Sequence, residues 1–600
     1  MSDPSLLHKL FSLFTKRQKR NMVILLVFFF VSSVLQLVGV AAIFPFMNVV
    51  TDPSSVHSDP LLSFFYNMFH FTNIKSFIVA SGIAMFVLLI FSNALAAFTI
   101  WLKTKYVMGL NHNLSRRLLG LYLSRPYTFF LTRSSSDLGS NILYEVNQLT
   151  QQLLLPLFDL VIQSLIVLAM VVFLLFTDVV TTLIAFSIVG GAYVITNYTA
   201  RKKTKKAGNE RLAANKGRFA STGEAISGIK VTKVLGREGY FLESFTHYSE
   251  RFIKVESYIN VVRDLPKFIL EAIAFGGVVM LVVVMTLRTD NVLSILPFVT
   301  LFAFAGYKMM PALQTIYRSV VSVYFNQAIV DTLYQEMVAT EESEYSFLEE
   351  KERTRLPFNR EVRLDHIDFS YNRSEIPTLK EITLTIPKNS SIGFVGSTGS
   401  GKTTLIDLIL GLLEPKHGTI FVDDTPLTLE NVRSWQANIG YVPQDIYLTD
   451  NSIARNIAFG IGEDQLDMDR VRQAARIAAL ERFVDEELPH GFHTIVGERG
   501  IRLSGGQRQR IGLARALYDN PEILILDEAT SALDGTTERA VMEAIQAAST
   551  NRTMIMIAHR ISTVKDCDVI YLLDKGEVSD FGTYAELIEK NPTFRKMARI

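Results

Sequence analysis

A run of small residues that ends in lysine and threonine has the composition of a phosphate-binding loop. It reads Gly396-Ser397-Thr398-Gly399-Ser400-Gly401-Lys402-Thr403, follows a strand-like apolar stretch, and continues into a helix-like stretch that starts at Thr404. Glycines let the backbone curl so that successive N–H groups face phosphate oxygens, and the N-terminus of the next helix adds its positive dipole end. Lys402 would contact the β- and γ-phosphates, and the Thr403 hydroxyl would be a ligand for Mg²⁺. Because the whole pattern stands between a strand and a helix, we favour a nucleoside triphosphate site over an ordinary flexible turn.

Two carboxylates follow a second apolar stretch and could complete this site. Asp527 and Glu528 come directly after Ile523-Leu524-Ile525-Leu526, a run typical of a strand buried on both faces. An aspartate at the end of such a strand is the usual Mg²⁺-side partner of a phosphate loop. Glu528 would then lie at the mouth of the site and polarise the attacking water. Adjacent acids after a strand are common, so this interpretation depends on the phosphate loop.

Two more features could bind nucleotide. Tyr371 stands about 25 residues before the phosphate loop, where its ring either stacks on adenine or packs as a core residue at a strand edge. Ser504-Gly505-Gly506-Gln507 precedes a helix-like stretch at 508–517. The amides of these residues could form a second anion cradle at a helix N-terminus, although alone they would be only a flexible cap.

In this order the features resemble those of ATP-binding-cassette (ABC) proteins, over about 240 residues of the chain. Gln444, Asp534 (after Ser531-Ala532-Leu533) and His559 extend the resemblance. It implies that Gln444 joins Mg²⁺ and water to the contact with a membrane domain. It also implies that Asp534 links two nucleotide sites, that His559 holds the γ-phosphate, and that residues 497–500 touch the helices that couple the two domains.

The same resemblance implies that two chains act together. The sequence has one phosphate loop and one cradle at 504–507, and in this family ATP is held between the loop of one cassette and the cradle of another. A single copy therefore cannot complete a site. A homodimer with two-fold symmetry is the simplest arrangement, with ATP and Mg²⁺ as the cofactors.

Composition divides the 600 residues into an apolar part and a soluble part. The net charge of +1 gives no reason to expect nucleic acid as a partner, and the single cysteine, Cys567, excludes an intramolecular disulfide framework. A membrane-spanning helix needs roughly 20 mainly apolar residues. Six stretches meet this requirement, at about 21–50, 76–101, 155–177, 179–198, 268–287 and 291–313. We therefore predict an α-helical transmembrane domain with six spans, fused to an α/β ATPase domain with a phosphate loop.

The basic residues predict the orientation of the chain. Lysines and arginines gather before the first span, after the second and after the fourth, whereas the other connections hold few. Because cytoplasmic connections carry such an excess, we expect both termini and the ATPase domain on the cytoplasmic side of a bacterial inner membrane. The basic run at 201–206 either contributes only to this bias or binds anionic lipid.

The predicted boundaries are 1–20 for a cytoplasmic interfacial helix, 21–325 for the transmembrane domain, 326–357 for a linker and 358–600 for the ATPase domain. An amphipathic helix at about 59–71, with Asp59 as N-cap and Pro60 as its first residue, would lie on the outer membrane surface. It could act on lipid tails or only pack against the spans. The long cytoplasmic connections would place short helices near 127–137 and 227–240 against the ATPase domain.

Cations within the apolar part are candidates for a substrate path, because a charge in the membrane is costly and usually faces a partner or a polar pathway. Lys267 lies one helical turn before Glu271, so these two residues could simply pair. Lys308 has no such acid near it in the sequence. We name Lys267 and Lys308 as candidate residues of a substrate cavity.

Six spans ahead of the cassette resemble an exporter of the type IV half-transporter class. The stretches 265–273, 307–311 and 439–448 also resemble bacterial lipid-linked oligosaccharide flippases of the PglK type. This resemblance implies ATP-driven flipping of a polyprenyl-pyrophosphate glycan, a lipid-linked substrate, with cavity cations facing the pyrophosphate. The alternative is a multidrug or lipid A-type exporter. A membrane-anchored ATPase that transports nothing is disfavoured by the six spans.

Overall fold

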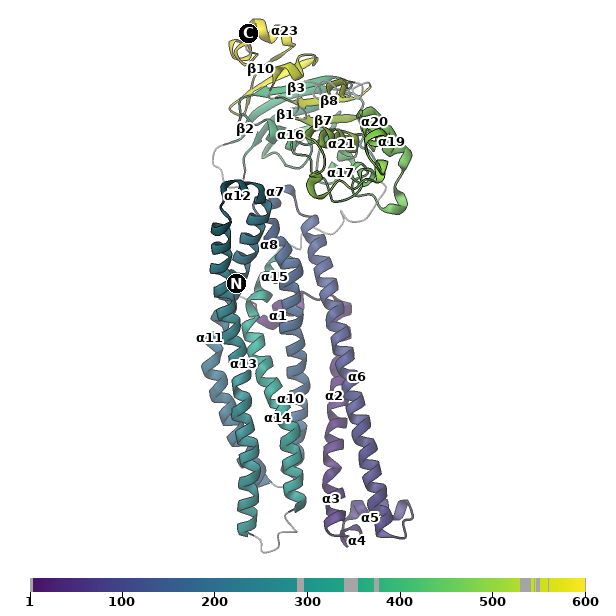
Figure 1. The fold of residues 1–600 in the computed structure, drawn as a ribbon, viewed down its shortest axis with the longest axis vertical. Coiled ribbons are helices and arrows are strands. Elements are labelled where there is room, and N and C mark those ends of the chain that lie inside the picture. Colours follow the sequence, from purple (N-terminus) through teal and green to yellow (C-terminus); the bar gives the residue numbers. More distant parts are fainter. Residues whose placement is uncertain are drawn as a thin grey trace. The chain divides into compact units, whose positions relative to one another are not determined.

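The chain forms two compact units in the computed structural model, which describes residues 4–177, 179–288, 296–338, 354–371, 377–528, 541–543, 545–546, 551–558 and 560–598. The first, here called the helical unit, comprises Met1–Arg125 and Thr132–Leu348. The second, the α/β unit, comprises Pro126–Leu131 and Glu349–Ile600 (Figure 1). The short segment Pro126–Leu131 therefore groups with the α/β unit, although both of its neighbours in the sequence belong to the helical unit.

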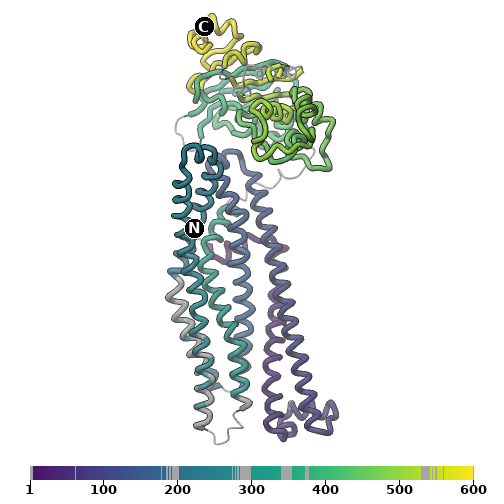
Figure 2. The backbone as a smooth tube through the Cα atoms, viewed as in Figure 1, coloured from purple at the N-terminus to yellow at the C-terminus, as the bar shows by residue number. Residues whose placement is uncertain are grey.

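Long helices make up the helical unit. Within the described residues, six helices have 23 to 51 residues: α2 (Lys16–Ala41), α6 (Ile74–Leu123), α10 (Leu155–Thr177), α11 (Val179–Ser227), α13 (Glu238–Arg288) and α14 (Leu296–Phe325). Helix α11 packs against α13, and α10 packs against α14 (Figures 1 and 2).

Three helical stretches of the described residues are long and apolar enough to cross a membrane: Lys16–Thr51, Ile74–Leu123 and Ser135–Thr177. They contain the spans expected at 21–50, 76–101 and 155–177. The spans expected at 179–198, 268–287 and 291–313 fall mainly on α11, α13 and α14 and include residues that lie outside the described side chains.

Local sequence explains where one of these helices begins and how closely two of them pack. The Thr15 hydroxyl accepts a hydrogen bond from the Gln18 amide (3.4 Å), and the Gln18 side chain accepts one from the Thr15 amide (2.9 Å). This reciprocal pair starts α2 because it satisfies N–H groups that a first turn leaves without partners. On α11, Gly217 faces Tyr248 of α13, and a Cβ atom there would lie 2.3 Å from the tyrosine ring. The absence of a side chain at Gly217 therefore lets the two helices approach closely.

Three short helices connect α2 to α6: α3 (Ile43–Thr51), α4 (Ser55–Ser58) and α5 (Pro60–Met68). The Asp59 carboxylate accepts a hydrogen bond from the Leu62 amide at 3.3 Å, and Pro60 is the first residue of α5, as the sequence predicts. Leu62 is buried in a small apolar cluster with Val49, Val56 and Phe77. Phe64 and Phe69, by contrast, are 61% and 62% exposed. One side of the segment from α3 to α5 is therefore buried within the helical unit, and an apolar side remains exposed.

The two connections expected to contact the ATPase domain hold shorter helices than the sequence suggests. The stretch at 127–137 contains α7 (Tyr127–Phe130) and the start of α8 (Ser135–Gly139), because the Ser134 hydroxyl caps a new helix there. The stretch at 227–240 contains α12 (Ile229–Leu235), which ends at Gly236 in the left-handed conformation (φ +61°) that favours glycine.

Both ends of the helical unit also differ from the expected division. Helix α1 covers Leu6–Ser12, and the basic residues from Lys16 onward already belong to α2. The stretch at 326–357, expected as a linker, begins with α15 (Gln327–Met337). Ile329, Val330 and Leu333 on α15 are fully buried. Their i, i+1, i+4 spacing gives α15 an apolar face, so its burial in the unit outweighs its short length.

Helical segments of the helical unit also include η1 (Ser140–Glu145), α9 (Val146–Gln148) and η2 (Leu149–Leu154), which continue α8 into α10, with π-helical turns in η1 and η2. A π-turn leaves its helix wider than an α-turn and occurs often at functional sites.

Two sheets form the centre of the α/β unit. Within the described residues, one is antiparallel in the order β2-β1-β4-β5: β1 (Glu361–Phe369), β2 (Leu379–Pro387), β4 (His417–Val422) and β5 (Thr425–Pro426). The other has the order β10-β9-β3-β8-β7-β6: β3 (Ser391–Gly396), β6 (Ile439–Val442), β7 (Ile523–Asp527), β8 (Thr553–Ile557), β9 (Val569–Asp574) and β10 (Glu577–Gly582). Strands β3, β6, β7, β8 and β9 are parallel, so their carboxyl ends share one edge.

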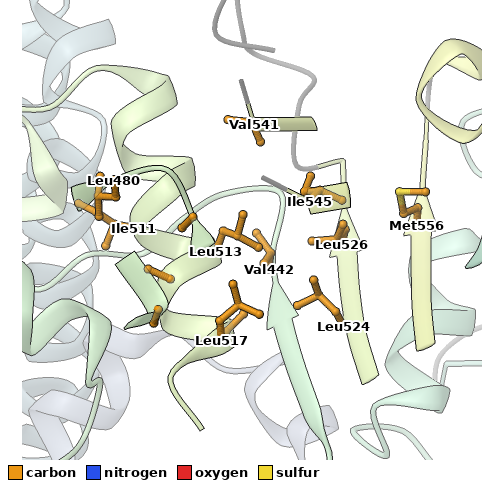
Figure 3. Close-up of a cluster of buried hydrophobic side chains, with 14 of the residues drawn as sticks. Val442, Leu480, Ile511, Leu513, Leu517, Leu524, Leu526, Val541, Ile545 and Met556 are labelled. Carbon is orange, nitrogen blue, oxygen red and sulfur yellow. The ribbon is translucent and has the colours of Figure 1, made fainter. Parts of the chain in front are cut away.

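The helices of the α/β unit within the described residues are α16 (Lys402–Ile409), α17 (Val432–Gln436), α18 (Ile453–Ile457), α19 (Met468–Ile477), α20 (Glu481–Glu487), α21 (Gly505–Leu517), α23 (Tyr584–Lys590) and α24 (Pro592–Met597). Helices α16, α21 and α23 pack against strands of the second sheet. Every residue of β7 and β8 is buried, which explains their continuous apolar sequence. Figure 3 shows Leu524, Leu526 and Val442 of the sheet gathered with Leu513 and Leu517 of α21. The same cluster contains Cys567, whose pKa is raised to about 12 mainly by burial.

Candidate active site

The phosphate loop has the local geometry that its glycines predict. It joins the end of β3 to the start of α16, and Gly399 (φ +82°) and Gly401 (φ +100°) have left-handed backbone conformations. A Cβ atom on Gly401 would lie 2.6 Å from a methyl carbon of Leu379 and 3.2 Å from the Thr378 carbonyl oxygen. Only glycine therefore fits the turn into α16 without distortion.

Lys402 points back into this loop. Its ammonium donates hydrogen bonds to the carbonyl oxygens of Gly396 (2.9 Å) and Ser397 (3.0 Å). Burial lowers the pKa of Lys402, while the nearby carboxylates of Glu528 and Asp527 act in the opposite direction. The loop thus holds a buried cation close to two acids, which is an environment suited to a polyanionic ligand.

The two acids lie where β7 ends, next to the end of β6. Asp527 is buried, and Glu528 adopts a left-handed backbone conformation (φ +49°). The Gln444 side-chain amide donates a 2.8 Å hydrogen bond to the Glu528 carboxylate. A non-glycine residue in this conformation is uncommon and is often found where function constrains the backbone. Lys402, Gln444, Asp527 and Glu528 therefore form one cluster, as the sequence analysis expects.

Two further residues of this cluster were not predicted from the sequence. The Tyr441 hydroxyl forms a hydrogen bond with Asp527, and burial is the main cause of the raised pKa of Tyr441. Asp407 on α16 has its pKa raised to about 6, first by burial and then by the negative charge of Asp527. The signal for Asp407 was its position one helical turn after Thr403, on the same face of α16. Tyr441 carries no comparable signal except its place three residues before Gln444.

The hydroxyl groups of the loop have different environments. The Thr404 hydroxyl and the Tyr371 hydroxyl are 3.1 Å apart, and the Tyr371 ring packs edge-on against Phe369 with ring centres 5.0 Å apart. Tyr371 is half-buried and packs at the end of β1, and stacking of its ring on adenine stays a prediction. Thr403 is exposed, and Ser400 is buried with its hydroxyl oxygen lacking a hydrogen-bond partner among the described residues. An orphaned buried hydroxyl beside backbone amides is consistent with a loop built to receive phosphate.

The residues expected to form a second anion cradle lie at the start of α21. The Ser504 hydroxyl accepts a hydrogen bond from the Gln507 amide (3.2 Å), and the Gln507 side chain accepts one from the Ser504 amide (2.7 Å). Gly505 and Gly506 form the first turn of the helix. Asp534 and His559, with residues 531–533, lie outside the described residues.

The candidate cavity lysines differ from each other. Lys267 and Glu271 of α13 are 3.7 Å apart and both partly exposed, as expected for a pair one turn apart. Among the described residues Lys308 of α14 forms no ion pair, and it is half-buried. The structure adds ion pairs that the sequence analysis missed: Lys103 with Asp159, Asp264 with Arg318 (2.8 Å), and Glu145 with Arg211 (3.2 Å). Their partners are 54 or more residues apart, so no local spacing reveals them.

Comparisons with known proteins decide the family. A family model described as "ABC transporter transmembrane region" matches residues 22–312, and one described as "ABC transporter" matches residues 379–531. An ATP-dependent lipid A-core flippase of Alkalilimnicola ehrlichii is 32% identical over 489 residues, covering 80% of each chain. The chain belongs to the ABC transporter family.

Other similar proteins agree with this assignment of the ABC transporter. An ATP-dependent lipid A-core flippase of Cupriavidus metallidurans is 30% identical over 485 residues, covering 80% of each chain. A solved structure of a bacterial Atm1-family ABC exporter with ATP bound has a TM-score of 0.74 and 22% identity, and the match covers 97% of both chains. These findings confirm the predicted fold class and an ATPase domain fused to a transmembrane domain, in a transporter that couples ATP hydrolysis to transport.

Proposed function

We propose that this ABC transporter is a homodimer that uses ATP hydrolysis to flip a phosphate-bearing glycolipid of the lipid A type across the bacterial inner membrane. The observation that carries the proposal is the similarity to lipid A-core flippases at 30–32% identity over four-fifths of the chain. It favours the lipid A alternative of the sequence analysis over a polyprenyl-pyrophosphate glycan. Both substrates combine a lipid anchor, phosphate and sugar, so either one would need a cavity that accepts these three groups.

The nucleotide roles follow from the cluster around Lys402. Backbone amides of 397–403, the Thr404 amide and the Lys402 ammonium would hold the phosphates, and Tyr371 would lie against the base. Thr403, Gln444 and Asp527 would hold Mg²⁺, which neutralises charge on the β- and γ-phosphates when bound. Glu528 would polarise the attacking water, with its carboxylate oriented by the amide of Gln444. The donor set is hard oxygen, as Mg²⁺ prefers.

Dimer formation would complete each site. One chain supplies a single phosphate loop and a single cradle at Ser504, Gly505, Gly506 and Gln507, so a second copy would bring its cradle to the first chain's loop. Asp534 would join the two sites, and His559 would contact the γ-phosphate. Closing of the two cassettes would favour one arrangement of the membrane helices, and reopening would favour the other, because a ligand shifts only an equilibrium between states that it binds differently.

The phosphate of the substrate would face cations of the helical unit. Lys308 is the stronger candidate because its charge is not balanced by an ion pair within the described residues, whereas Lys267 shares its charge with Glu271. A charge held in apolar surroundings is costly and is usually offset by a partner. A phosphate group on the transported lipid would be that partner.

Reconstitution of the full chain in liposomes would test the substrate. Transport and ATP turnover would be compared with a lipid A-type glycolipid, a polyprenyl-pyrophosphate glycan and a hydrophobic cation. We expect the glycolipid to be flipped and to stimulate turnover. Preferred transport of the pyrophosphate glycan would reinstate the other flippase reading, and transport of the hydrophobic cation alone would reject both.

Two variants would test the cavity role. Lys308→Ala should slow flipping while ATP turnover without substrate stays unchanged. Lys206→Ala removes an exposed lysine of α11 and serves as the control. Normal flipping by Lys308→Ala would reject Lys308 as a phosphate partner.

A further inference from the structure

Helix α15 is the last described element of the helical unit before the chain enters the α/β unit. It ends at Met337, and the described residues resume at 354. Ile329, Val330 and Leu333 are fully buried, and Met337 is 1% exposed, so one side of α15 is fixed in the core of the helical unit. Any movement of the chain that follows α15 therefore reaches a helix packed firmly among its neighbours.

Glu336, in the last turn of α15, is tied to the first cytoplasmic connection. Its carboxylate lies 3.1 Å from the Arg133 guanidinium, and its side chain is only 10% exposed. The Tyr122 hydroxyl at the end of α6 also forms a hydrogen bond with the Glu336 side chain. Arg125 donates a 3.4 Å hydrogen bond to the Glu336 backbone oxygen. Carbonyls in the last turn of a helix lack partners within that helix, and a cation there also faces the negative end of the helix dipole.

The two arginines that contact Glu336 flank a segment of the other unit. Arg125 and Arg133 stand on either side of Pro126–Leu131, the segment that groups with the α/β unit. The chain thus leaves the helical unit for the α/β unit at two places, once through Pro126–Leu131 and once after α15. Glu336 contacts the two arginines that flank the first place, and it lies in the helix that precedes the second.

We propose that Glu336 is a positioning residue that makes these two connections move as one body. The inference rests on the proposed ATP-driven transport, because it concerns how movement of the α/β unit reaches the membrane helices. With Glu336 in place, a displacement of Pro126–Leu131 shifts α15 and the end of α6 together. Without Glu336, Pro126–Leu131 and α15 move separately, and the same displacement of Pro126–Leu131 moves α14 less.

If the contact of Glu336 with Arg133 only stabilised the fold, its loss would lower stability without weakening the coupling between the two units. Arg133 is 44% exposed, and ion pairs with an exposed partner contribute little to stability. Loss of the pair should therefore leave the protein folded while weakening the coupling between the two units. The Lys9–Asp331 pair (2.7 Å) is a matched control, since Asp331 lies on the same helix but joins α15 to α1 instead of to the first connection.

The test measures coupling separately from hydrolysis, in the full chain in lipid nanodiscs. Cysteines at two exposed positions of the helical unit, Asn67→Cys and Phe176→Cys, carry spin labels, and their distance is compared with and without ATP. We expect Glu336→Arg to reduce the fraction of molecules that change distance by about tenfold, within the range of allosteric coupling. ATP turnover should stay within about twofold, as for a substitution away from the reacting groups. Asp331→Asn should behave like the parent protein.

A charge exchange separates the pair from its individual residues. Arg133→Glu should impair the distance change as Glu336→Arg does, and the double variant should recover most of it. An unchanged distance response in Glu336→Arg would overturn the proposal. So would a double variant that folds, hydrolyses ATP and remains as impaired as the single variants. If the parent protein moves none of the tested lipids while the Glu336-dependent distance change persists, the proposed substrate fails and this inference stands.

Discussion

The amide of Gln444 donates a 2.8 Å hydrogen bond to the carboxylate of Glu528, although the two residues are 84 positions apart. The register of the sheet explains their meeting. Strands β6 and β7 are parallel neighbours, with Tyr441 opposite Ile525 and Val442 opposite Leu526. Residues that follow these strands therefore emerge at the same edge. The hydrogen bond thus joins the segment after β6 to the carboxylate at the end of β7.

Replacement of Glu528 should separate binding from hydrolysis. Glu528→Gln keeps the shape of the side chain and a carbonyl oxygen but removes the charge that polarises water, so we expect phosphate release to fall by about a hundredfold or more. Nucleotide affinity, measured with a fluorescent analogue, should be retained, and two chains should stay associated in ATP. Glu430→Gln, at an exposed position, is the control. Hydrolysis at the parental rate by Glu528→Gln would remove Glu528 from its role.

Two glycines of the phosphate loop should respond differently to alanine. Gly401→Ala combines a left-handed conformation with a Cβ atom 2.6 Å from Leu379, whereas a Cβ atom on Gly399 meets no heavy atom within 4 Å. We expect Gly399→Ala to cost about 1 kcal/mol of stability. Gly401→Ala should cost about 2 kcal/mol or more and should weaken nucleotide binding. Thermal unfolding and nucleotide titration would check the order, and equal effects of both substitutions would contradict the loop geometry.

Asp407 should make stability depend on pH. Its pKa of about 6 in the folded chain lies above the ordinary value of 3.8, so the folded state binds this proton more tightly than the unfolded state. The resulting stabilisation is complete below about pH 4 and is lost as the pH rises through about 6. Asp407→Asn removes this titration. The unfolding temperature of the parent protein should therefore fall relative to that of Asp407→Asn between pH 4 and pH 7, and parallel curves would contradict the assignment.

The buried pair of Glu145 and Arg211 should be sensitive to the loss of one partner. Both side chains are 1% exposed, and Asn215 donates a further hydrogen bond to Glu145 at 3.1 Å. Glu145→Ala leaves a buried guanidinium without its counter-charge and should cost about 3–5 kcal/mol. Replacement of both partners by Leu and Met should cost less than the single change.

Thermal unfolding in detergent would measure these differences. The exposed pair of Arg251 and Glu210, 3.7 Å apart, provides a control in which Glu210→Gln should change stability by less than about 0.5 kcal/mol. A loss of stability in Glu145→Ala as small as that in Glu210→Gln would contradict the expected contribution of the buried pair.

Features set by short stretches of chain could be predicted from the sequence. The phosphate loop needs Gly399, Gly401 and Lys402 at fixed spacing, because neighbouring backbone groups must curl around phosphate. The start of α5 at Asp59 and Pro60 has a similarly local cause. Long apolar runs marked the membrane helices for the same reason.

Features set by tertiary packing could not be predicted in this way. Arg133 and Glu336 are 203 positions apart, and Glu145 and Arg211 are 66 apart, so their partners become evident only when the helices are packed. Helix α15 falls in the stretch expected as a linker, and its 11 residues are too few to hold a helix in isolation. The burial of its apolar face supplies the missing stability.

The position of β3 sets the order in which a new copy acquires its parts. This strand lies between β8 and β9, which come from residues 553–574. A ribosome delivers the N-terminal end first, so every membrane helix has left it before either neighbour of β3 is made. The loop at 396–403 has no finished support until then. A chain that ends before residue 553 would therefore hold the strand that leads into the phosphate loop without either of its neighbours.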